Sequence, residues 1–209
     1  MIKLVIDTCS TDLIMSIVTN DCIVDSKIIN QNKNHSNNFL LELKKLLDDN
    51  NFTLEDVSLV AITNGPGSFT GVRISLVFAK IFAYLKNVEV KAISKLRFNI
   101  SGYEKYDYYG SMIKDKNNNV YAGIYDENYD TLYEKLVNID EFLHIFSSYS
   151  GEKCIIIDTD YDKYAFSKPK FNFLKVTNFK SNNEGKSIHT LNPNYLKLTQ
   201  AQEKLNVKN

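Results

Sequence analysis

The chain has 209 residues, and its 25 lysines and arginines balance its 25 aspartates and glutamates to a formal net charge of zero. This balance argues against a protein that binds nucleic acid by itself, because non-specific affinity for a phosphate backbone comes from a net cationic surface. Hydrophobic residues make up 44% of the chain and charged residues 24%, a composition that is typical of a globular protein and excludes wholesale disorder.

The first hundred residues alternate between short β-rich runs and amphipathic helices. The runs 2–7, 13–19 and 22–30 are separated by turn residues and predict a three-stranded antiparallel meander. The pattern then predicts a helix over 36–48, a buried strand over 59–63, a helix over 70–86 and a strand over 88–93. This order is that of a ribonuclease-H-like unit, the building block of the actin-like ATPase superfamily, so we expect an α/β fold by analogy.

The second half predicts a further meander. Its expected strands are 108–113, 120–125 and 132–137, followed by a helix over 139–146 and strands over 154–157 and 173–176. A final helix is expected over 199–205. We therefore predict two lobes of mixed sheet with helices: a first lobe over 1–100, a smaller second lobe over 101–190, and a C-terminal segment, 191–209, that returns to the first lobe.

The sequence contains no pattern typical of a targeting signal and no paired spacing of cysteines. Asp7 interrupts the apolar start of the chain, and no stretch approaches 18 apolar residues, so we expect no signal peptide, no membrane span and a cytoplasmic protein. The three cysteines, Cys9, Cys22 and Cys154, lack the paired spacing of a zinc site or a secreted disulfide framework.

A glycine-rich segment, 65–71, follows a predicted buried strand and opens a predicted helix. Its backbone N–H groups and the helix dipole could form an anion cradle. Gly65 and Gly67 would allow positive φ or close approach of a ligand, and Ser68 or Thr70 could cap the helix. The alternative is a tight strand-to-helix turn without a ligand.

The end of the first strand is a second candidate for phosphate binding. Asp7 is followed by Thr8 and further hydroxyl side chains, and such an acid can hold a magnesium-bound phosphate. It can equally accept hydrogen bonds from the amides of its own turn. With the glycine-rich segment, Asp7 and Thr8 would suit an actin-like phosphotransferase or nucleotide hydrolase, which is the alternative function.

The predicted helix over 70–86 is apolar around most of its circumference. A helix of this kind has to be covered on more than one side. Either it is wedged between the sheet and the first helix, or the two helices together present a face to another subunit. The pattern alone leaves both arrangements open.

Several stretches resemble the TsaB (YeaZ) family, the accessory subunits of the bacterial machinery that makes threonylcarbamoyladenosine in tRNA. The most specific is NGPGSFTGVRI at 64–74. Further matches are LVIDTCST at 4–11, His35-Ser36 at a helix start, VYAGIY at 120–125 and NPNYLK at 192–197. The resemblance is strong to about residue 94 and thinner beyond. It implies an actin-like, two-lobed fold related to the catalytic subunit TsaD.

The resemblance also implies that this chain is not an enzyme. TsaD-like proteins carry two metal-ligating histidines four residues apart after the last strand of the first lobe, and the matching positions here are Lys95 and Asn99. We therefore expect no catalytic residue, no metal site and no tightly bound cofactor, with ATP held, if at all, at the interface of a complex. The acid-small-arginine stretch that usually precedes VYAGIY is replaced by 114–116, Lys-Asp-Lys.

The implied partner is a TsaD-type catalytic subunit, bound through helices of the first lobe in a heterodimer. A TsaE-type ATPase would join the larger complex, tRNA would be contacted only indirectly, and a homodimer could form when the chain is alone. The expected interface residues are His35, Phe39, Leu43, Arg73, Val77, Phe78 and Ile81. For Arg73, an intramolecular salt bridge is the alternative, and for His35 a capping or packing role.

Overall fold

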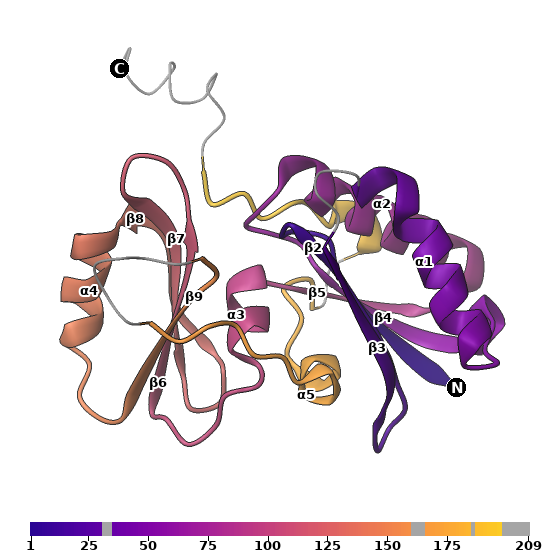
Figure 1. Ribbon diagram of the computed structural model, residues 1–209, viewed down its shortest axis with the longest axis horizontal. Coiled ribbons are helices and arrows are strands. Elements are labelled where there is room, and N and C mark those ends of the chain that lie inside the picture. Colours follow the sequence, from indigo (N-terminus) through magenta and orange to yellow (C-terminus); the bar gives the residue numbers. More distant parts are fainter. Residues whose placement is uncertain (31–34, 160–165, 185–186, 198–209) are drawn as a thin grey trace, which may run out of the picture.

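Two lobes, each built on one mixed β-sheet, lie side by side in the computed structural model (Figure 1). It describes residues 1–30, 35–159, 166–184 and 187–197, with the side chains of 35–37 left aside. Within this part of the chain, no helix is long and apolar enough to cross a membrane.

The first lobe contains a five-stranded sheet in the order β3-β2-β1-β4-β5. The strands β1 (Ile2–Asp7), β2 (Asp12–Val18) and β3 (Ile23–Asn30) form the antiparallel meander, and β4 (Val57–Thr63) and β5 (Glu89–Ile93) add in parallel. This is the ribonuclease-H-like order, so the predicted α/β, actin-like fold class is confirmed.

Helices cover both faces of this sheet. The helices α1 (His35–Asp49) and α2 (Phe69–Lys86) pack on one face, over Leu4 and Ile6. On the other face, Val5 packs with Phe98 of α3 (Lys95–Ile100) and with α5 (Phe173–Asn178). Successive residues of β1 point to opposite faces and both are buried, which explains why the strand is an unbroken apolar run.

The second lobe repeats the pattern with a four-stranded sheet in the order β8-β7-β6-β9. Its elements are β6 (Tyr108–Lys114), β7 (Asn119–Asp126), β8 (Thr131–Asn138), α4 (Ile139–Ser147) and β9 (Lys153–Ile157). The first three strands are antiparallel neighbours, and β9 adds in parallel to β6. Two short 3₁₀ turns, η1 (Leu54–Asp56) and η2 (Ile188–Thr190), lie in connections of the first lobe.

One predicted strand is wrong. Residues 173–176 belong to the helix α5, which begins after Asn172, and the Asn172 side chain caps it by accepting a hydrogen bond from the Lys175 N–H. A short apolar run has no periodicity that separates a strand from one helical turn, and the cap decides in favour of the helix. The helix predicted over 199–205 lies outside the described residues.

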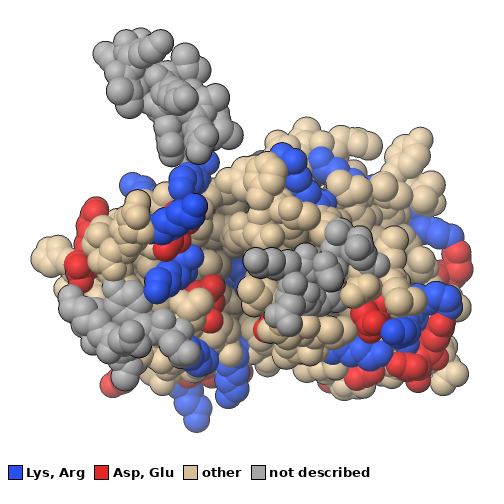
Figure 2. Space-filling model, turned by 45° about the horizontal axis from the view of Figure 1, so that its top comes forward, with Lys and Arg blue, Asp and Glu red and all other residues tan. Residues whose placement is uncertain are grey.

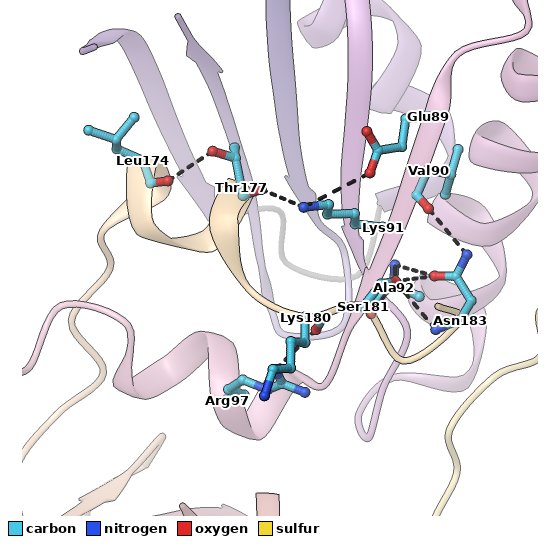
Figure 3. Close-up of polar contacts among 10 residues, drawn as sticks. All are labelled: Glu89, Val90, Lys91, Ala92, Arg97, Leu174, Thr177, Lys180, Ser181 and Asn183. Atoms are coloured by element: carbon cyan, nitrogen blue, oxygen red, sulfur yellow. Dashed lines mark hydrogen bonds and ion pairs between the residues drawn. The ribbon is translucent and has the colours of Figure 1, made fainter. Parts of the chain in front are cut away.

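Thr177 in the last turn of α5, with Ser181 and Asn183 beyond it, covers the free edge of β5 (Figure 3). The Ala92 N–H donates to Asn183 Oδ1 at 2.9 Å and to Ser181 Oγ at 3.0 Å, while Asn183 Nδ2 donates to the Val90 carbonyl at 3.2 Å. Lys91 Nζ donates to the Thr177 carbonyl at 3.0 Å. Side chains therefore replace the missing neighbour strand and protect the edge from pairing with another chain.

We expect Asn183→Ala to lower the free energy of unfolding by about 2 kcal/mol, because the Val90 carbonyl loses its side-chain donor and the Ala92 N–H keeps only Ser181 Oγ. Urea denaturation followed by circular dichroism measures this. The matched control is Asn178→Ala at the exposed end of α5, which should change stability by less than about 0.5 kcal/mol. Equal stability of the two variants would contradict the edge-covering role of Asn183.

Candidate functional site

A cleft of about 810 Å³ lies between the two lobes. Its first-lobe wall includes the turn after β1, the glycine-rich segment and α3, and its second-lobe wall includes Ile113, Tyr121 and Asp158. Of the six residues predicted to bind nucleotide, Gly67, Ser68 and Thr70 line this cleft.

The other three, Asp7, Thr8 and Gly65, are buried beside the cleft and do not line it.

At the end of β1, the Asp7 carboxylate is fully buried, and both of its oxygens accept hydrogen bonds from within the chain. Lys95 Nζ lies 2.6 Å from Asp7 Oδ2, and both side chains are almost completely inaccessible. Thr63 donates its hydroxyl to Asp7 Oδ1, and the Cys9 N–H donates to the same oxygen at 3.0 Å. Ser10 Oγ donates to Oδ2 at 3.2 Å. The Asp7 carboxylate therefore accepts hydrogen bonds from its own turn, from Thr63 and from the Lys95 ammonium.

Burial by itself raises the pKa of the Asp7 carboxyl. The charge of Lys95 and the hydrogen bonds from Lys95, Thr63 and the Cys9 N–H outweigh this effect, and the pKa of Asp7 lies below its ordinary value. The Asp7 carboxylate is therefore ionised at neutral pH, and Lys95 neutralises its charge inside the chain.

The glycine-rich segment is packed against its own backbone. A Cβ on Gly65 would lie 2.4 Å from the Asn194 carbonyl oxygen, and one on Gly71 would lie 1.8 Å from the Thr8 carbonyl oxygen. Gly65 also has a φ of +106°, which side chains disfavour. The Ser68 N–H donates to the Cys9 carbonyl at 2.7 Å, and Ser68 Oγ caps α2 by accepting from the Gly71 N–H at 3.2 Å. These contacts favour the tight-turn interpretation.

The two positions that hold metal-ligating histidines in TsaD-like proteins lie on α3 in this chain. Lys95 is held by Asp7, and Asn99 lines the cleft with its carboxamide atoms buried and unpartnered. No group of three or more His, Cys, Asp or Glu side chains in the described part of the chain is placed to hold a metal ion. Burial also raises the pKa of the Cys9 thiol far above its ordinary value, with a further contribution from Asp7, so this cysteine is not an activated nucleophile.

The residues predicted to contact a partner divide into two groups. Phe39 and Leu43 are buried in the core of the first lobe, and Phe78 is half-buried, with its ring 5.2 Å from that of Phe39. Val77 and Ile81 are each 54% exposed. The first group serves internal packing, because these side chains lie on the face of each helix that meets the sheet.

His35 and Arg73 are the two remaining residues of the predicted interface. The side chain of His35, at the start of α1, lies outside the described residues. Arg73 makes no salt bridge to an acid among the described residues: its guanidinium lies 3.8 Å from the Phe69 ring centroid, and its Nε donates to Tyr195 Oη at 3.3 Å. Both aromatic contacts leave Arg73 exposed at the surface of α2.

Exposed apolar side chains gather on α1 and α2. We call this the apolar face; it consists of Leu40, Leu41, Phe69, Val77, Ile81, Tyr84 and Leu85. Four of them, with Arg73, form an i, i+4 ridge along α2 at 69, 73, 77, 81 and 85, the spacing that aligns side chains for helix packing. The upper part of the first lobe in Figure 2 is mostly tan, with some blue and no red.

The interface expected from the family resemblance includes only two residues of the apolar face, Val77 and Ile81. The i, i+4 ridge along α2 was present in the sequence as a signal, but the even apolarity of the helix hid which side would remain exposed. Only packing against the sheet separates the ridge at 69–85 from the buried side that contains Val72, Leu76 and Ala79.

A family model described as "TsaD: tRNA N6-adenosine threonylcarbamoyltransferase" matches residues 22–192. The Bacillus subtilis tRNA threonylcarbamoyladenosine biosynthesis protein TsaB is 32% identical over 60% of this chain and 55% of its own length. The TsaB protein of Buchnera aphidicola is 36% identical over 46% of this chain and 45% of its own length. This chain belongs to the TsaD family, and its resemblance to the TsaB (YeaZ) proteins is confirmed.

The aligned region spans about half the length of these two curated TsaB relatives. Among solved structures, a Pseudomonas aeruginosa protein described as similar to peptidase YEAZ aligns with a TM-score of 0.72 at 18% identity, over 94% of this chain and 99% of that chain. YeaZ from Pseudomonas aeruginosa aligns with a TM-score of 0.66 at 16% identity, over 93% and 99%. These structures share the two-lobed fold of this TsaB-family chain.

Proposed function

We propose that this chain is a non-catalytic subunit of tRNA threonylcarbamoyladenosine synthesis that binds and stabilises a TsaD-type catalytic subunit. The curated relatives are described as proteins of this biosynthesis. The observation that carries the proposal is the apolar face of α1 and α2, where Val77, Ile81, Tyr84 and Leu85 are each more than half exposed. Large apolar side chains exposed together on two contacting helices indicate a protein-protein contact site.

The residues of α2 indicate which kind of surface on a partner would complement the apolar face. The helix α2 contains Arg73, Lys80 and Lys86 and no acidic residue. Lys86 is already paired with Glu55, so Arg73 and Lys80 are the cations of α2 that a partner would meet. The complementary surface opposite α2 is therefore apolar at its centre with carboxylates at its rim, because opposite charges across a rim steer association and exclude wrong partners. We assign this surface to the TsaD-type subunit.

The absence of a catalytic role is supported by the Asp7–Lys95 pair. In the resemblance to TsaD-like proteins, the α3 position of Lys95 belongs to a metal-ligating histidine, and here that position holds an ammonium group bound to a buried carboxylate. The second position, Asn99, offers only a neutral amide, a poor ligand for metals that histidine pairs hold. A metal at these two positions would first have to displace the Lys95 ammonium.

The alternative, a phosphotransferase or nucleotide hydrolase, is disfavoured by the same cleft. Lys95 is neutralised by Asp7, and the Ser68 and Gly71 N–H groups are hydrogen-bonded within the chain. The lining also includes three aspartates, Asp12, Asp115 and Asp158, against two lysines. This excess of carboxylates opposes binding of a nucleoside triphosphate through its phosphates. We therefore place any ATP at the interface with a partner.

The remaining assignments follow from the same proposal. A TsaE-type ATPase would join the larger complex, tRNA would contact the assembly through the partners, and the complex would be cytoplasmic. Without its partner, the chain would cover the apolar face by forming a homodimer. The net charge of zero suits a subunit whose main contact is another protein.

Reconstitution tests the proposed function. We expect the purified chain alone to form no threonylcarbamoyladenosine, and we expect its addition to a TsaD-type subunit with the remaining components to raise product formation at least tenfold. Mass spectrometry of digested tRNA measures the modified nucleoside. Turnover by this chain without a TsaD-type subunit would overturn the non-catalytic assignment, and equal product with and without the chain would overturn the accessory role.

A further inference from the structure

Residues 191–197, which we call the strap, run from the first lobe to the second lobe (Figure 1). At its start, Leu191 is buried in the first-lobe core beneath α1 and α2. The Asn194 N–H donates to the Asn64 carbonyl at 2.7 Å, directly before the glycine-rich segment. The strap is therefore anchored to the first lobe by both core packing and a backbone hydrogen bond.

The other end of the strap contacts the second lobe. Asn194 Nδ2 donates to Glu134 Oε2 at 3.3 Å, and the second oxygen of Glu134 accepts a hydrogen bond from the buried Tyr125 hydroxyl. Leu196 packs against the second-lobe cluster that contains Tyr125, and Lys197 Nζ lies 3.4 Å from Asp115 Oδ2. One residue, Asn194, thus bonds to both lobes, through its main chain on one side and its side chain on the other.

The same strap supports one end of the apolar face. The ring of Tyr195 stacks on Phe69 with centroids 5.2 Å apart and an interplanar angle of 18°. The Tyr195 hydroxyl accepts from Arg73 Nε at 3.3 Å, while the Arg73 guanidinium covers the Phe69 ring. Phe69 and Arg73 are the first two residues of the α2 ridge, so Tyr195 sets the position of their exposed side chains.

The fit between the strap and the glycine-rich segment is tight. The Asn194 carbonyl oxygen lies so close to Gly65 that a Cβ there would be 2.4 Å away. Close-packed elements of this kind move between discrete arrangements instead of deforming gradually. A shift of Tyr195 on the apolar face therefore moves its neighbour Asn194, and with it the bond to Glu134.

We propose that the strap couples the apolar face to the second lobe: Tyr195 positions Phe69 and Arg73 for the partner, and Asn194 ties that arrangement to Glu134 on β8. The proposal rests on the proposed function, since it takes a TsaD-type subunit as the occupant of the apolar face. Binding of that subunit would hold the second lobe in one position, and by reciprocity the second lobe's hold on the strap would raise affinity for the subunit. Asn194 and Tyr195 act as positioning residues.

A double-mutant cycle on the Asn194–Glu134 hydrogen bond tests the coupling. Asn194→Asp places two carboxylates against each other, whereas Glu134→Gln places two amides against each other, which keep one hydrogen bond when the Asn194 carboxamide turns over and leave an acceptor for Tyr125. Asn194→Asp alone should weaken binding of the TsaD-type subunit by about tenfold, and Glu134→Gln alone by less than about threefold, measured by calorimetry. The double variant restores the bond with donor and acceptor exchanged, and its affinity should return to within about threefold of the wild type.

The matched control is Glu141→Gln in α4, which has the same chemistry on the second lobe without a strap contact and should leave affinity unchanged. Glu134 lies outside the apolar face, so a loss of affinity in Asn194→Asp that is recovered when Glu134→Gln is added is a result that a merely local structural role would not produce. Wild-type affinity in Asn194→Asp, or no recovery in the double variant, would overturn the coupling.

Amide hydrogen exchange in the isolated chain separates this proposal from the proposed function. In Asn194→Asp, exchange should rise at both 69–73 and 131–138, and it should return to wild-type rates in the double variant. If the wild-type chain fails to bind a TsaD-type subunit, the proposed function fails while the exchange result still supports the link. Unchanged exchange at 69–73 in a chain that does bind the subunit would overturn the link alone.

Discussion

Replacement of Lys95 by alanine should lower the free energy of unfolding by about 3–5 kcal/mol, because it leaves a buried carboxylate without its counter-charge. Asp7 is fully inaccessible, and Lys95 is its only cationic partner among the ion pairs of the described residues. The remaining hydrogen bonds, from Thr63, Cys9 and Ser10, would stabilise the carboxylate only in part. Urea denaturation at neutral pH measures the loss.

The pH dependence of this loss gives a sharper test. In the wild type, the pKa of Asp7 is lowered from its ordinary value of 3.8, so the ion pair contributes stability at higher pH and loses it as the pH falls through the lowered pKa. In Lys95→Ala, burial dominates and raises the pKa of Asp7, so protonation relieves the unpaired charge. The stability difference between the two proteins should therefore be largest at neutral pH and shrink as the pH falls through the raised pKa of Asp7 in the variant and towards its lowered pKa in the wild type.

A matched double variant, Asp7→Asn with Lys95→Met, removes both charges together. It should be markedly more stable than Lys95→Ala, because a neutral amide and an apolar side chain carry no uncompensated charge. If Lys95→Ala is as stable as the wild type at neutral pH, or if the difference does not vary with pH, the assignment of Lys95 as the internal counter-charge of Asp7 is wrong.

Ile81→Asp should weaken binding of the TsaD-type subunit by more than about 100-fold, because a carboxylate would be desolvated at the centre of an apolar contact. Ile81 is 54% exposed in the chain alone, so the variant should fold. Its thermal unfolding should stay within a few degrees of the wild type. Calorimetry with the purified subunit, and mass measurement of the mixture in solution, report the complex.

Leu132→Asp is the matched control for this variant. Leu132 is an exposed apolar residue, 47% accessible, on β8 of the second lobe, and its substitution should leave affinity within about twofold. Phe78 and Phe39 are unsuitable for the test, since both belong to the packed interior of the first lobe. Tight binding by folded Ile81→Asp would exclude the apolar face as the site of the complex.

The elements of both sheets could be predicted from the sequence, because their signals are local. Alternating and continuous apolar runs placed the strands, and the i, i+3, i+4 stripe placed α1 within a residue of its ends at His35 and Asp49. The order of the first-lobe elements then indicated the fold. The failure at 173–176 has the same origin: four apolar and polar residues without periodicity do not separate a strand from a single turn of helix.

The sequence pattern correctly located the glycine-rich segment, but it did not indicate why glycine is needed there. The glycines at 65 and 71 are required by carbonyl groups of Asn194 and Thr8, which lie far away in the sequence. Likewise, Asp7 and Lys95 are 88 positions apart, and neither residue carries a local sign of the other. Long-range contacts of this kind leave no trace in a window of neighbouring residues.

The sequence by itself determined the strands, the main helices, the ribonuclease-H-like order and the family motifs, since each depends on residue types at short, regular spacing. Only the tertiary structure decided that Asp7 is neutralised by Lys95, that Val77 and Ile81 remain exposed while Phe39 and Leu43 are buried, and that the strap joins the two lobes. Burial and pairing depend on which distant surfaces meet, and in this chain they pair Asp7 with Lys95 and leave one side of α2 exposed.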